Sequence, residues 1–415
     1  MKFVFPDSLD LVDPSFDFAT EERSSDRVRQ RDDQYAHEVF REVPFHGLLV
    51  SKAIVDGLAG ASSAKYTMAQ RQRLLREGVR PFFRLSETNL FTMGDCGAFS
   101  YVREKEPPYT VEEVARFYAN CGFDIGISVD HVILDFNEKY DEALPGLDLV
   151  PAMWRERQTI TLELASQFLS LHKRERPRFA PMGVAQGWSP QSYAFAVAEL
   201  QKMGYKRIAL GGLVPLKTKQ IVASLQAANG VRKAGTEFHL LGVTRTEAIA
   251  TFASLGTSSF DSTSPLRQAF KDDKDNYYTI DTTYAAVRVP QVEGNPKLGR
   301  QIKSGQVDFG KARTLEQRCL DVLARLDRGS APLEEALDAL RAYEVLYDPS
   351  VDRTEVYRRT LGDRPWKRCA CEICQRLGIH VILFRGAERN RRRGFHNLYV
   401  FRQRLNREFD ITLRK

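Results

Sequence analysis

Short apolar segments alternate with helix-forming segments from Pro44 to about Arg267. Many of the apolar segments end in Gly, Asp or Gln, and helix-capping signals such as Thr110 with Glu113 stand between them. Eight strands that alternate with helices over about 220 residues are the pattern of a (β/α)8 barrel. The predicted strands are 45–51, 79–85, 89–95, 123–130, 179–186, 207–212, 238–243 and 257–262.

An open, doubly wound α/β sheet is the alternative that the same alternation allows. Such sheets often bind dinucleotides through a G-x-G-x-x-G turn after the first strand, and no such motif follows residues 45–51. We therefore predict an α/β fold built on a (β/α)8 (TIM) barrel.

The alternation is confined to part of the chain, and this divides the sequence into four regions. After Arg267 the sequence becomes polar and rich in turns, and two helical patterns follow at 314–327 and 332–345. The predicted regions are an N-terminal extension (1–43), the barrel (44–270), a mostly helical insertion (271–365) and a C-terminal subdomain that ends in a helix (366–415).

Three cysteines near the C-terminus lie close together and are followed by a histidine. They are Cys369, Cys371 and Cys374 and, after a basic segment, His396. Three thiolates and one imidazole complete a tetrahedral Zn²⁺ shell and leave no position for a substrate, so a structural Zn²⁺ cofactor is predicted. The alternative, three buried free cysteines and a surface histidine, is disfavoured because the whole chain has only 6 cysteines. We expect residues 366–415 to form a zinc-binding subdomain.

The remaining composition is that of an ordinary globular protein. Hydrophobic residues make up 43% of the chain, and no run of about 18 apolar residues occurs. The N-terminus is acidic and broken by prolines, unlike a signal peptide. Cys96, Cys121 and Cys319 are scattered and indicate no disulfide framework. These features predict a cytoplasmic protein with no membrane partner.

Five arginines crowd into residues 385–393, between the cysteines and the histidine, although the net charge of the chain is only +7. Phe384 and Phe395 are interleaved with them. Such a cluster is often a solvated face, but beside a rigid metal site it favours a phosphate-binding surface. Together with Arg267, which follows the last predicted strand, the predicted nucleic-acid-binding residues are Arg385, Arg389, Arg391, Arg392 and Arg393.

Polar residues and glycines stand at the ends of several predicted strands. In a (β/α)8 barrel the carboxyl ends of all strands meet at one mouth, where the active site lies. A single aspartate in such a place often only caps the next helix, but capping explains the whole set poorly. The residues at these strand ends are Asp95, Asp130, Gln186, Gly211, Gly212 and Asp261.

These residue types suit a displacement at a sugar carbon that carries a purine base. One carboxylate can attack the anomeric carbon while a second handles the proton of the leaving group. A third carboxylate and an amide can read the hydrogen-bonding edge of the purine. Two adjacent glycines let a flat ring approach the backbone closely.

The motifs that contain these residues resemble those of tRNA-guanine transglycosylases. GDCGAF is similar to their D-S-G-G-F, and VAQGW with ALGGLV to their V-Q-G-G and I-G-G-L. LLGVTRTEAI with SFDSTSPLR is similar to their M-G-V-G-T-P-E and M-F-D-C-V-x-P-T-R. The C-x-C-x₂-C…H set matches in type and order. The resemblance covers residues 45–270 and 366–400, and its specificity lies in the order of the motifs.

The resemblance implies a role for each matching residue. Asp261 would be the nucleophile on C1′ of the target guanosine, and Asp95 the general acid and base for the departing and incoming bases. Asp130 and Gln186 would hold the guanine-type ring, and the three cysteines and His396 would be structural zinc ligands. Backbone contacts to the base would come from Gly211, Gly212 and Leu213.

Differences from the tRNA enzymes indicate a branch that acts on DNA. Cys96 stands where the family has Ser, and the insertion at 271–365 is foreign to the tRNA enzymes. Lys217 replaces a glutamate that helps the bacterial tRNA enzymes to accept an aminomethyl base, so a neutral substituent such as a nitrile is expected. These features resemble the bacterial 7-deazaguanine transglycosylases of DNA-modification clusters.

The predicted function is the replacement of guanine in DNA by 7-cyano-7-deazaguanine through a covalent Asp261–deoxyribose intermediate. The partners would be DNA, the 7-deazaguanine base and other proteins of a DNA-modification cluster. Two alternatives stay open: the same exchange on tRNA, and a non-catalytic nucleic-acid-binding subunit. The second is disfavoured because several buried carboxylates cost free energy to desolvate, and a non-catalytic subunit has no need of them.

Overall fold

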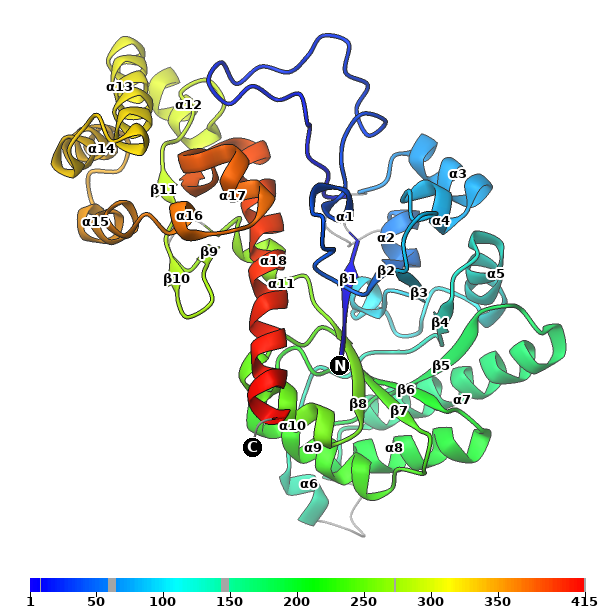
Figure 1. Ribbon diagram of the computed structural model, residues 1–415. Helices are drawn as coiled ribbons and strands as arrows, with labels where there is room; N and C mark the ends of the chain where they lie inside the picture. The colour runs from blue at the N-terminus through cyan, green and yellow to red at the C-terminus, as the bar shows by residue number, and fades with distance from the viewer. Residues whose placement is uncertain (8, 59–64, 143–148, 272–273, 414–415) are drawn as a thin grey trace. The chain divides into compact units, whose positions relative to one another are not determined.

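The computed structural model describes residues 1–7, 9–58, 65–142, 149–271 and 274–413 (Figure 1). The chain divides into two units, one of residues 1–9, 45–263 and 405–415, and the other of residues 10–44 and 264–404. Among the helices that the structure describes, none has both the length and the apolar composition needed to cross a lipid bilayer.

Eight parallel strands close into a barrel in the first unit, which confirms the predicted α/β barrel fold. Each strand pairs with the next along the chain, and the last closes the ring by pairing with the first. Most strand residues are buried, as is typical of a parallel sheet covered by helices. The strands are β1 (Lys2–Pro6), β2 (Gly47–Ser51), β3 (Phe91–Asp95), β4 (Ile125–Ile127), β5 (Ala180–Ala185), β6 (Arg207–Leu210), β7 (Glu237–Leu240) and β8 (Thr257–Asp261).

Helices connect these strands and lie outside the barrel (Figure 1). One of them begins at a predicted signal, because Thr110 caps the helix that follows it through a capping box with Glu113. Ser189 caps another helix, whose first residue is Pro190. The helices of this unit are α2 (Lys52–Asp56), α3 (Met68–Glu77), α4 (Val79–Phe82), η1 (Ala98–Tyr101), α5 (Val111–Cys121), α6 (Lys139–Glu142), α7 (Ala152–Glu175), α8 (Pro190–Met203), α9 (Thr218–Gly230), η3 (Thr246–Ala248) and α10 (Ile249–Ser254).

Apolar side chains from six of the strands fill the barrel interior. Residues two apart on a strand point to the same side, so Met93 inside the barrel directs Asp95, at the end of β3, toward the same interior. The strands are parallel, and the register pairs Ser51 with Asp95 and Val4 with Asp261, so the carboxyl ends of β3 and β8 lie at the same edge of the barrel. The interior cluster consists of Val4, Leu49, Met93, Ile127, Met182, Val184 and Ala209.

The prediction of a strand at 79–85 is wrong. Val79 and Phe82 are buried on the short helix α4, which follows Gly78 with a φ of 84°, and Pro81 lacks the N–H that a strand interior needs. The missing strand is β1, inside the predicted N-terminal extension, where Lys2–Pro6 is continuously apolar after its first residue. The other predicted strands coincide with β2 to β8.

The second unit is mostly helical, with two small pairs of strands. The predicted helix at 314–327 lies within α13, and the predicted helix at 332–345 corresponds to α14, which begins one residue later, at Leu333. Helix α18 begins in this unit, and its last residues belong to the first. The elements are α1 (Ala36–Val39), α11 (Ser264–Gln268), β9 (Tyr277–Tyr278), β10 (Thr283–Tyr284), β11 (Val287–Arg288), α12 (Pro296–Lys303), α13 (Phe309–Arg328), α14 (Leu333–Tyr347), α15 (Thr354–Asp363), α16 (Pro365–Arg368), α17 (Glu372–Leu377), η4 (Gly378–Ile382), β12 (Leu383–Phe384) and α18 (Gly386–Leu413).

The predicted region boundaries at 43/44, 270/271 and 365/366 do not coincide with the two units. Residues 1–9 belong to the barrel unit, whereas residues 10–44 belong with 264–404, so the predicted extension is divided between both. The insertion and the cysteine-rich segment form one unit because β11 of the insertion pairs with β12 of the C-terminal segment. In the same unit, Glu21 forms ion pairs with Arg385 and Arg389 of the C-terminal segment.

Candidate active site and metal-binding cluster

Asp95 lies at the end of β3, where two other carboxylates act on it. Burial raises the pKa of Asp95 to about 8, and the charges of Asp130 and Asp261 act in the same direction. Hydrogen bonds from the backbone of Gly97 and Cys96 lower the pKa but do not offset burial. A carboxyl group with this pKa holds its proton at neutral pH and can act as a general acid.

Asp130 follows β4 and is held through both carboxylate oxygens. The Cys96 thiol donates to Oδ1 at 3.2 Å, and Gln186 Nε2 donates to Oδ2 at 2.7 Å. Burial raises the pKa of Asp130 to about 6, although both hydrogen bonds lower it. The Tyr101 hydroxyl also donates to the backbone carbonyl of Asp130, at 3.1 Å. The orientation of this carboxylate is therefore fixed by the protein.

Gln186 follows β5, and two glycines that follow β6 make room for it. Its Oε1 accepts a hydrogen bond from the Ile133 backbone at 3.1 Å. A Cβ on Gly211 would lie 2.2 Å from Gln186 Nε2, and a Cβ on Gly212, whose φ is 72°, would lie 2.2 Å from the Ile133 carbonyl oxygen. Leu213 is buried directly after them. Contacts within the protein, with Gln186 and the Ile133 carbonyl oxygen, are therefore enough to require glycine at both positions, even without a ligand.

Asp261 ends β8, and its two oxygens differ in their surroundings. Oδ1 accepts hydrogen bonds from the backbone N–H of Gly242 at 3.0 Å and from His239 Nε2 at 3.2 Å. Among the described residues, no group donates to Oδ2, while the residue as a whole is 7% exposed. One oxygen is therefore fixed in position and the other is left available to a ligand.

Two residues that were not among the predicted site residues lie close to these carboxylates, His239 in space and Phe99 in the sequence. His239 is fully buried on β7, and strand alternation alone could have placed it on the inner side. Phe99 is 52% exposed on η1, four positions after Asp95 in the GDCGAF motif. An exposed aromatic ring beside a candidate site offers a stacking surface.

The predicted metal ligands come together in the second unit. The ligand atoms of Cys369, Cys371, Cys374 and His396 all lie within 4.8 Å of one another. His396 Nδ1 faces the three Sγ atoms, and Nε2 lies 2.8 Å from the Tyr278 carbonyl oxygen, to which it can donate. A carbonyl acceptor on the far nitrogen fixes the tautomer that leaves Nδ1 free for a metal. Tyr277 stacks on the imidazole at a centroid distance of 4.1 Å. The cluster fits a bound metal ion.

The comparisons with known proteins give the family. No family model matches the chain. A DNA-guanine transglycosylase from Salmonella montevideo is 51% identical over 418 residues, which cover 100% of this chain and 98% of the relative. The chain belongs to the DNA-guanine transglycosylase family. The match to a DNA-guanine transglycosylase spans both the barrel with its carboxylates and the segment with the Cys₃His cluster, and it confirms the predicted family and its DNA-modifying branch.

For this DNA-guanine transglycosylase family member, the prediction that the clustered arginines form a phosphate-binding surface is wrong for four of them. Arg389, Arg392 and Arg393 lie on helix α18, and Arg385 directly precedes it. All four are buried and bonded to the protein. Arg385 pairs with Glu21 and Glu316, and Arg389 with Glu21. The buried residues are Arg385, Arg389, Arg392 and Arg393, with exposed fractions of 5%, 1%, 6% and 0%.

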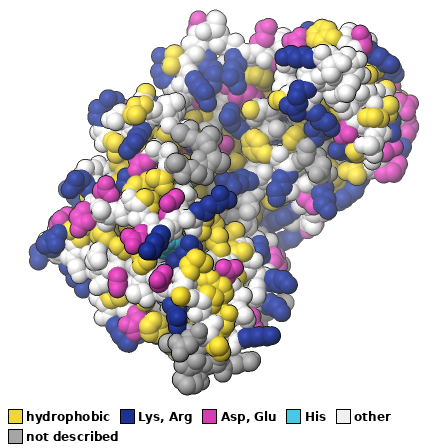
Figure 2. Space-filling view, turned by 180° about the vertical axis from the view of Figure 1, so that it is seen from behind, with side chains coloured by type: hydrophobic (Ala, Val, Ile, Leu, Met, Phe, Trp, Pro, Cys, Tyr) yellow, Lys and Arg dark blue, Asp and Glu magenta, His cyan; other side chains and the backbone are white. Residues whose placement is uncertain are grey.

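The other two predicted arginines remain accessible. The Arg391 side chain is 27% exposed and lies 3.8 Å from Glu388 and 4.0 Å from Asp10. Arg267 is exposed on α11. On the face shown in Figure 2, Lys and Arg side chains occur over much of the surface with Asp and Glu side chains between them. Exposed positive charge is therefore present, but the four buried arginines do not supply it.

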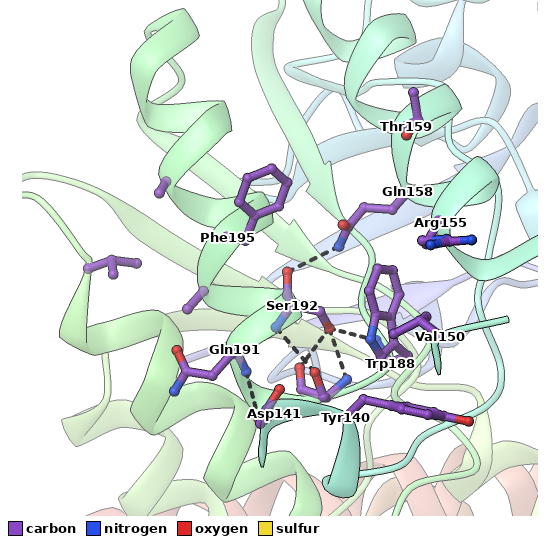
Figure 3. A pocket seen from close by; sticks show the side chains of 14 residues that line it. Tyr140, Asp141, Val150, Arg155, Gln158, Thr159, Trp188, Gln191, Ser192 and Phe195 are labelled. Carbon is purple, nitrogen blue, oxygen red and sulfur yellow. Dashed lines mark hydrogen bonds between the residues drawn. The ribbon is translucent and has the colours of Figure 1, made fainter. Parts of the chain in front are cut away.

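A cavity of about 540 Å³ lies among helices α6, α7 and α8, behind the residues that follow β5. Figure 3 shows Gln158 reaching toward α8, where its Nε2 donates to the Ser192 carbonyl at 3.1 Å. The same Nε2 donates to the Gln186 carbonyl at 2.8 Å. None of the three site aspartates lines this cavity. Gln158 therefore holds the backbone of Gln186 from the side of this cavity.

Proposed function

We propose that the chain exchanges guanine in DNA for 7-cyano-7-deazaguanine through a covalent intermediate on Asp261. The name of the full-length relative, DNA-guanine transglycosylase, supports DNA as the polymer and guanine as the base that leaves. One observation carries the proposal: two carboxyl groups at one mouth have different surroundings. Asp95 has a pKa of about 8, and Asp261 offers an Oδ2 that no described residue donates to.

In the first half of the reaction, Asp261 Oδ2 attacks C1′ of the target deoxyribose. The C1′–N9 bond breaks, its electron pair goes to the guanine, and the proton on Asp95 passes to the departing base. The products are a glycosyl ester between Asp261 and the DNA, free guanine and an ionised Asp95. The raised pKa of Asp95 supports its role as the proton donor at neutral pH.

In the second half, the incoming base replaces guanine in the same pocket. The Asp95 carboxylate takes the N9 proton of this base, and N9 attacks C1′. The ester bond to Asp261 breaks, and its electron pair returns to the carboxylate. Both aspartates then regain their starting protonation states, so the exchange balances in protons and charge.

Asp130 and Gln186 would hold the ring of either base. Each carboxylate oxygen has more than one acceptor position, so Asp130 can accept N–H donors of the base while it keeps its hydrogen bonds from Cys96 and Gln186. The second N–H of the Gln186 amide can donate to the carbonyl oxygen of the ring. Backbone groups of Gly211, Gly212 and Leu213 would complete the contacts.

Guanine in a duplex is stacked, so the target nucleotide must leave the helix before Asp261 can reach C1′. We propose that the exposed ring of Phe99 stacks against the flipped base or its neighbour. The exposed Arg267, and the partly exposed Arg391, would contact DNA phosphates. Other proteins of a DNA-modification cluster would assist, and the free cysteines support action in a reducing cytoplasm.

The Cys₃His cluster would hold a structural Zn²⁺. Its donor set and the fixed tautomer of His396 fit zinc, and four protein ligands leave no open position. The ion would supply cross-linking of the segment around α17 to α18 and no catalytic chemistry. Removing it would therefore act on folding of the second unit.

Base exchange by the purified protein tests the proposal. The protein is incubated with duplex DNA or with tRNA in the presence of 7-cyano-7-deazaguanine, and the digested nucleosides are measured by mass spectrometry. We expect the modified nucleoside in DNA and not in tRNA. In competition, the nitrile base should exceed an aminomethyl base, because the exposed Lys217 at the start of α9 would repel an ammonium group.

Parallel reactions receive an extract of the source cells that lacks this gene, which supplies any partner proteins. Incorporation into tRNA alone would assign the polymer to tRNA. Incorporation into neither polymer, with and without the extract, would favour the non-catalytic subunit. A preference for the aminomethyl base would contradict the proposed role of Lys217 in base choice, but not the proposed transglycosylase activity.

A further inference from the structure

An irregularity in the barrel brings a histidine onto the candidate nucleophile. The pairing of β7 with β8 shifts between Phe238 and His239, so that Phe238 lies opposite Thr257 but His239 lies opposite Ser259. The extra residue, Ser258, turns its hydroxyl to the Phe238 carbonyl at 3.3 Å. A bulge of this kind re-aims the side chains that follow it and is common beside active sites.

The bulge places the imidazole of His239 between two side chains of β8. Ser259 and Asp261 are two residues apart and point to the same side of the strand. His239 Nδ1 lies 2.9 Å from Ser259 Oγ, and Nε2 lies 3.2 Å from Asp261 Oδ1. His239 is fully buried and Ser259 is 8% exposed, so water does not compete for these contacts.

The chemistry of the three groups fixes the direction of the hydrogen bond to the aspartate. An ionised carboxylate can only accept, so Nε2 of His239 must carry the hydrogen that it shares with Asp261. Ser259 engages the opposite nitrogen and prevents the ring from rotating. The chain Ser259–His239–Asp261 thus directs one N–H at Oδ1, in parallel with the backbone N–H of Gly242.

We propose that His239, held by Ser259, is a positioning residue that makes Asp261 a good leaving group in the second half of the exchange. This inference rests on the proposed function. When the ester on Oδ2 breaks, negative charge returns to the carboxylate, and Oδ1 already lies against two donors. Fixed donors aimed at an oxygen where charge develops lower the barrier of that step. In the first half the same carboxylate loses charge, so the donors assist orientation but not charge development.

The two halves therefore respond differently to loss of the imidazole. In His239→Leu, release of guanine and formation of the protein–DNA adduct should slow less than reaction of the isolated adduct with 7-cyano-7-deazaguanine. We expect the second rate to fall about tenfold more than the first, as for loss of one charge-assisted hydrogen bond. The adduct fraction at steady state should rise accordingly. Both half-reaction rates are measured by single-turnover assays on the full chain with duplex DNA.

Three further variants separate positioning from a structural role. His239→Gln keeps a side-chain N–H donor and should restore much of the second half-reaction. Ser259→Ala keeps the imidazole but frees its ring, and should reproduce the adduct accumulation in weaker form. His172→Gln is the matched control, because His172 lies on α7 with its Nε2 at the Phe179 carbonyl and outside the site. It should leave the partition between the two halves unchanged.

Equal slowing of both halves in His239→Leu and Ser259→Ala, with an unchanged adduct fraction, would overturn the inference and leave His239 a structural link between β7 and β8. If His239→Leu does not fold, the Gln and Ala variants decide the matter on the same readout. Failure of the unaltered protein to form any adduct would instead contradict the proposed function, so the two failures are distinguishable.

Discussion

Two groups of buried charges in this chain are built in opposite ways. At the barrel mouth, the charges of Asp130 and Asp261 act on Asp95, and among the described residues no Lys or Arg pairs with any of the three. In the second unit, the four buried arginines on or directly before α18 lie against carboxylates and carbonyl oxygens. Glu21, for example, bonds to both Arg385 and Arg389.

The pKa values of the two groups follow this difference. Burial raises the pKa of Asp95 to about 8 because no cation offsets it. Arg385 and Arg389 lower the pKa of Glu21 to about 2 although burial opposes them. A buried charge with its counterion holds two segments together, whereas like charges buried without one are ready to move a proton or attack a ligand. The pairing of charges, more than their burial, separates scaffold from site in this fold.

The largest effect is expected at the nucleophile. Asp261→Asn removes the attacking oxygen but keeps the size of the side chain, so guanine exchange should fall about 10⁴-fold and no protein–DNA adduct should form. Denaturing gels after incubation with labelled DNA report the adduct, and thermal unfolding reports the fold. Asp338→Asn, an exposed site on α14, is the matched control and should be inert. An adduct in the Asp261→Asn protein would place the nucleophile at another residue.

Breaking the paired charges should change stability instead of chemistry. Glu21→Gln leaves Arg389 without its carboxylate and Arg385 with Glu316 alone, and we expect the free energy of unfolding to fall by about 2–4 kcal/mol. Guanine release per folded molecule should be unchanged below the melting transition. Glu22→Gln changes the exposed neighbour and should shift the melting temperature little. A loss of activity larger than the loss of folded protein would contradict the distinction between the barrel mouth, which we expect to govern chemistry, and the paired charges, which we expect to govern stability.

The barrel and its strand-end residues could be predicted from the sequence. Strands β2 to β8 show as short apolar segments, and one topological rule brings Asp95, Asp130, Gln186 and Asp261 to the same mouth. The Cys₃His cluster follows from ligand type and spacing. These features depend on neighbours in the sequence or on a single architecture, so they can be derived before the structure is known.

The errors concern contacts between distant parts of the chain. β1 is short and separated from β2 by a long polar stretch, so the regular alternation of strands and helices does not indicate that it belongs to the barrel. The apolar run at 79–85 fits a short helix as well as a strand. Arg385 and Arg389 were predicted to lie on a surface because their shared partner Glu21 is distant in the sequence, 364 residues from Arg385. Strand alternation could have placed His239 on the inner side of the barrel, but its contact with Asp261 depends on the bulge between β7 and β8, which no sequence motif indicates.

The smallest expected effect is on the pH dependence of stability, and it tests whether the Asp95 carboxylate lacks a compensating cation. Its pKa rises from an ordinary value of 3.8 to about 8 on folding, so between these two values the folded state holds a proton that the unfolded state has lost. The free energy of unfolding must therefore decrease as pH rises through this window: the contribution is fully present below about pH 4 and lost by about pH 8. Asp95→Asn cannot titrate and removes that slope.

The Asp95→Asn protein should unfold like the unaltered protein at pH 4 and be more stable at pH 8. We expect a gain of about 1–2 kcal/mol, less than the full shift implies because the side chain is partly open to solvent. Chemical denaturation at both pH values measures it, with Asp338→Asn as the variant that should show no such gain. The same protein should lose guanine release, since it has no proton to give. Equal stability of the two proteins at pH 8 would mean that a cation compensates Asp95 after all, and the contrast between the mouth and α18 would disappear.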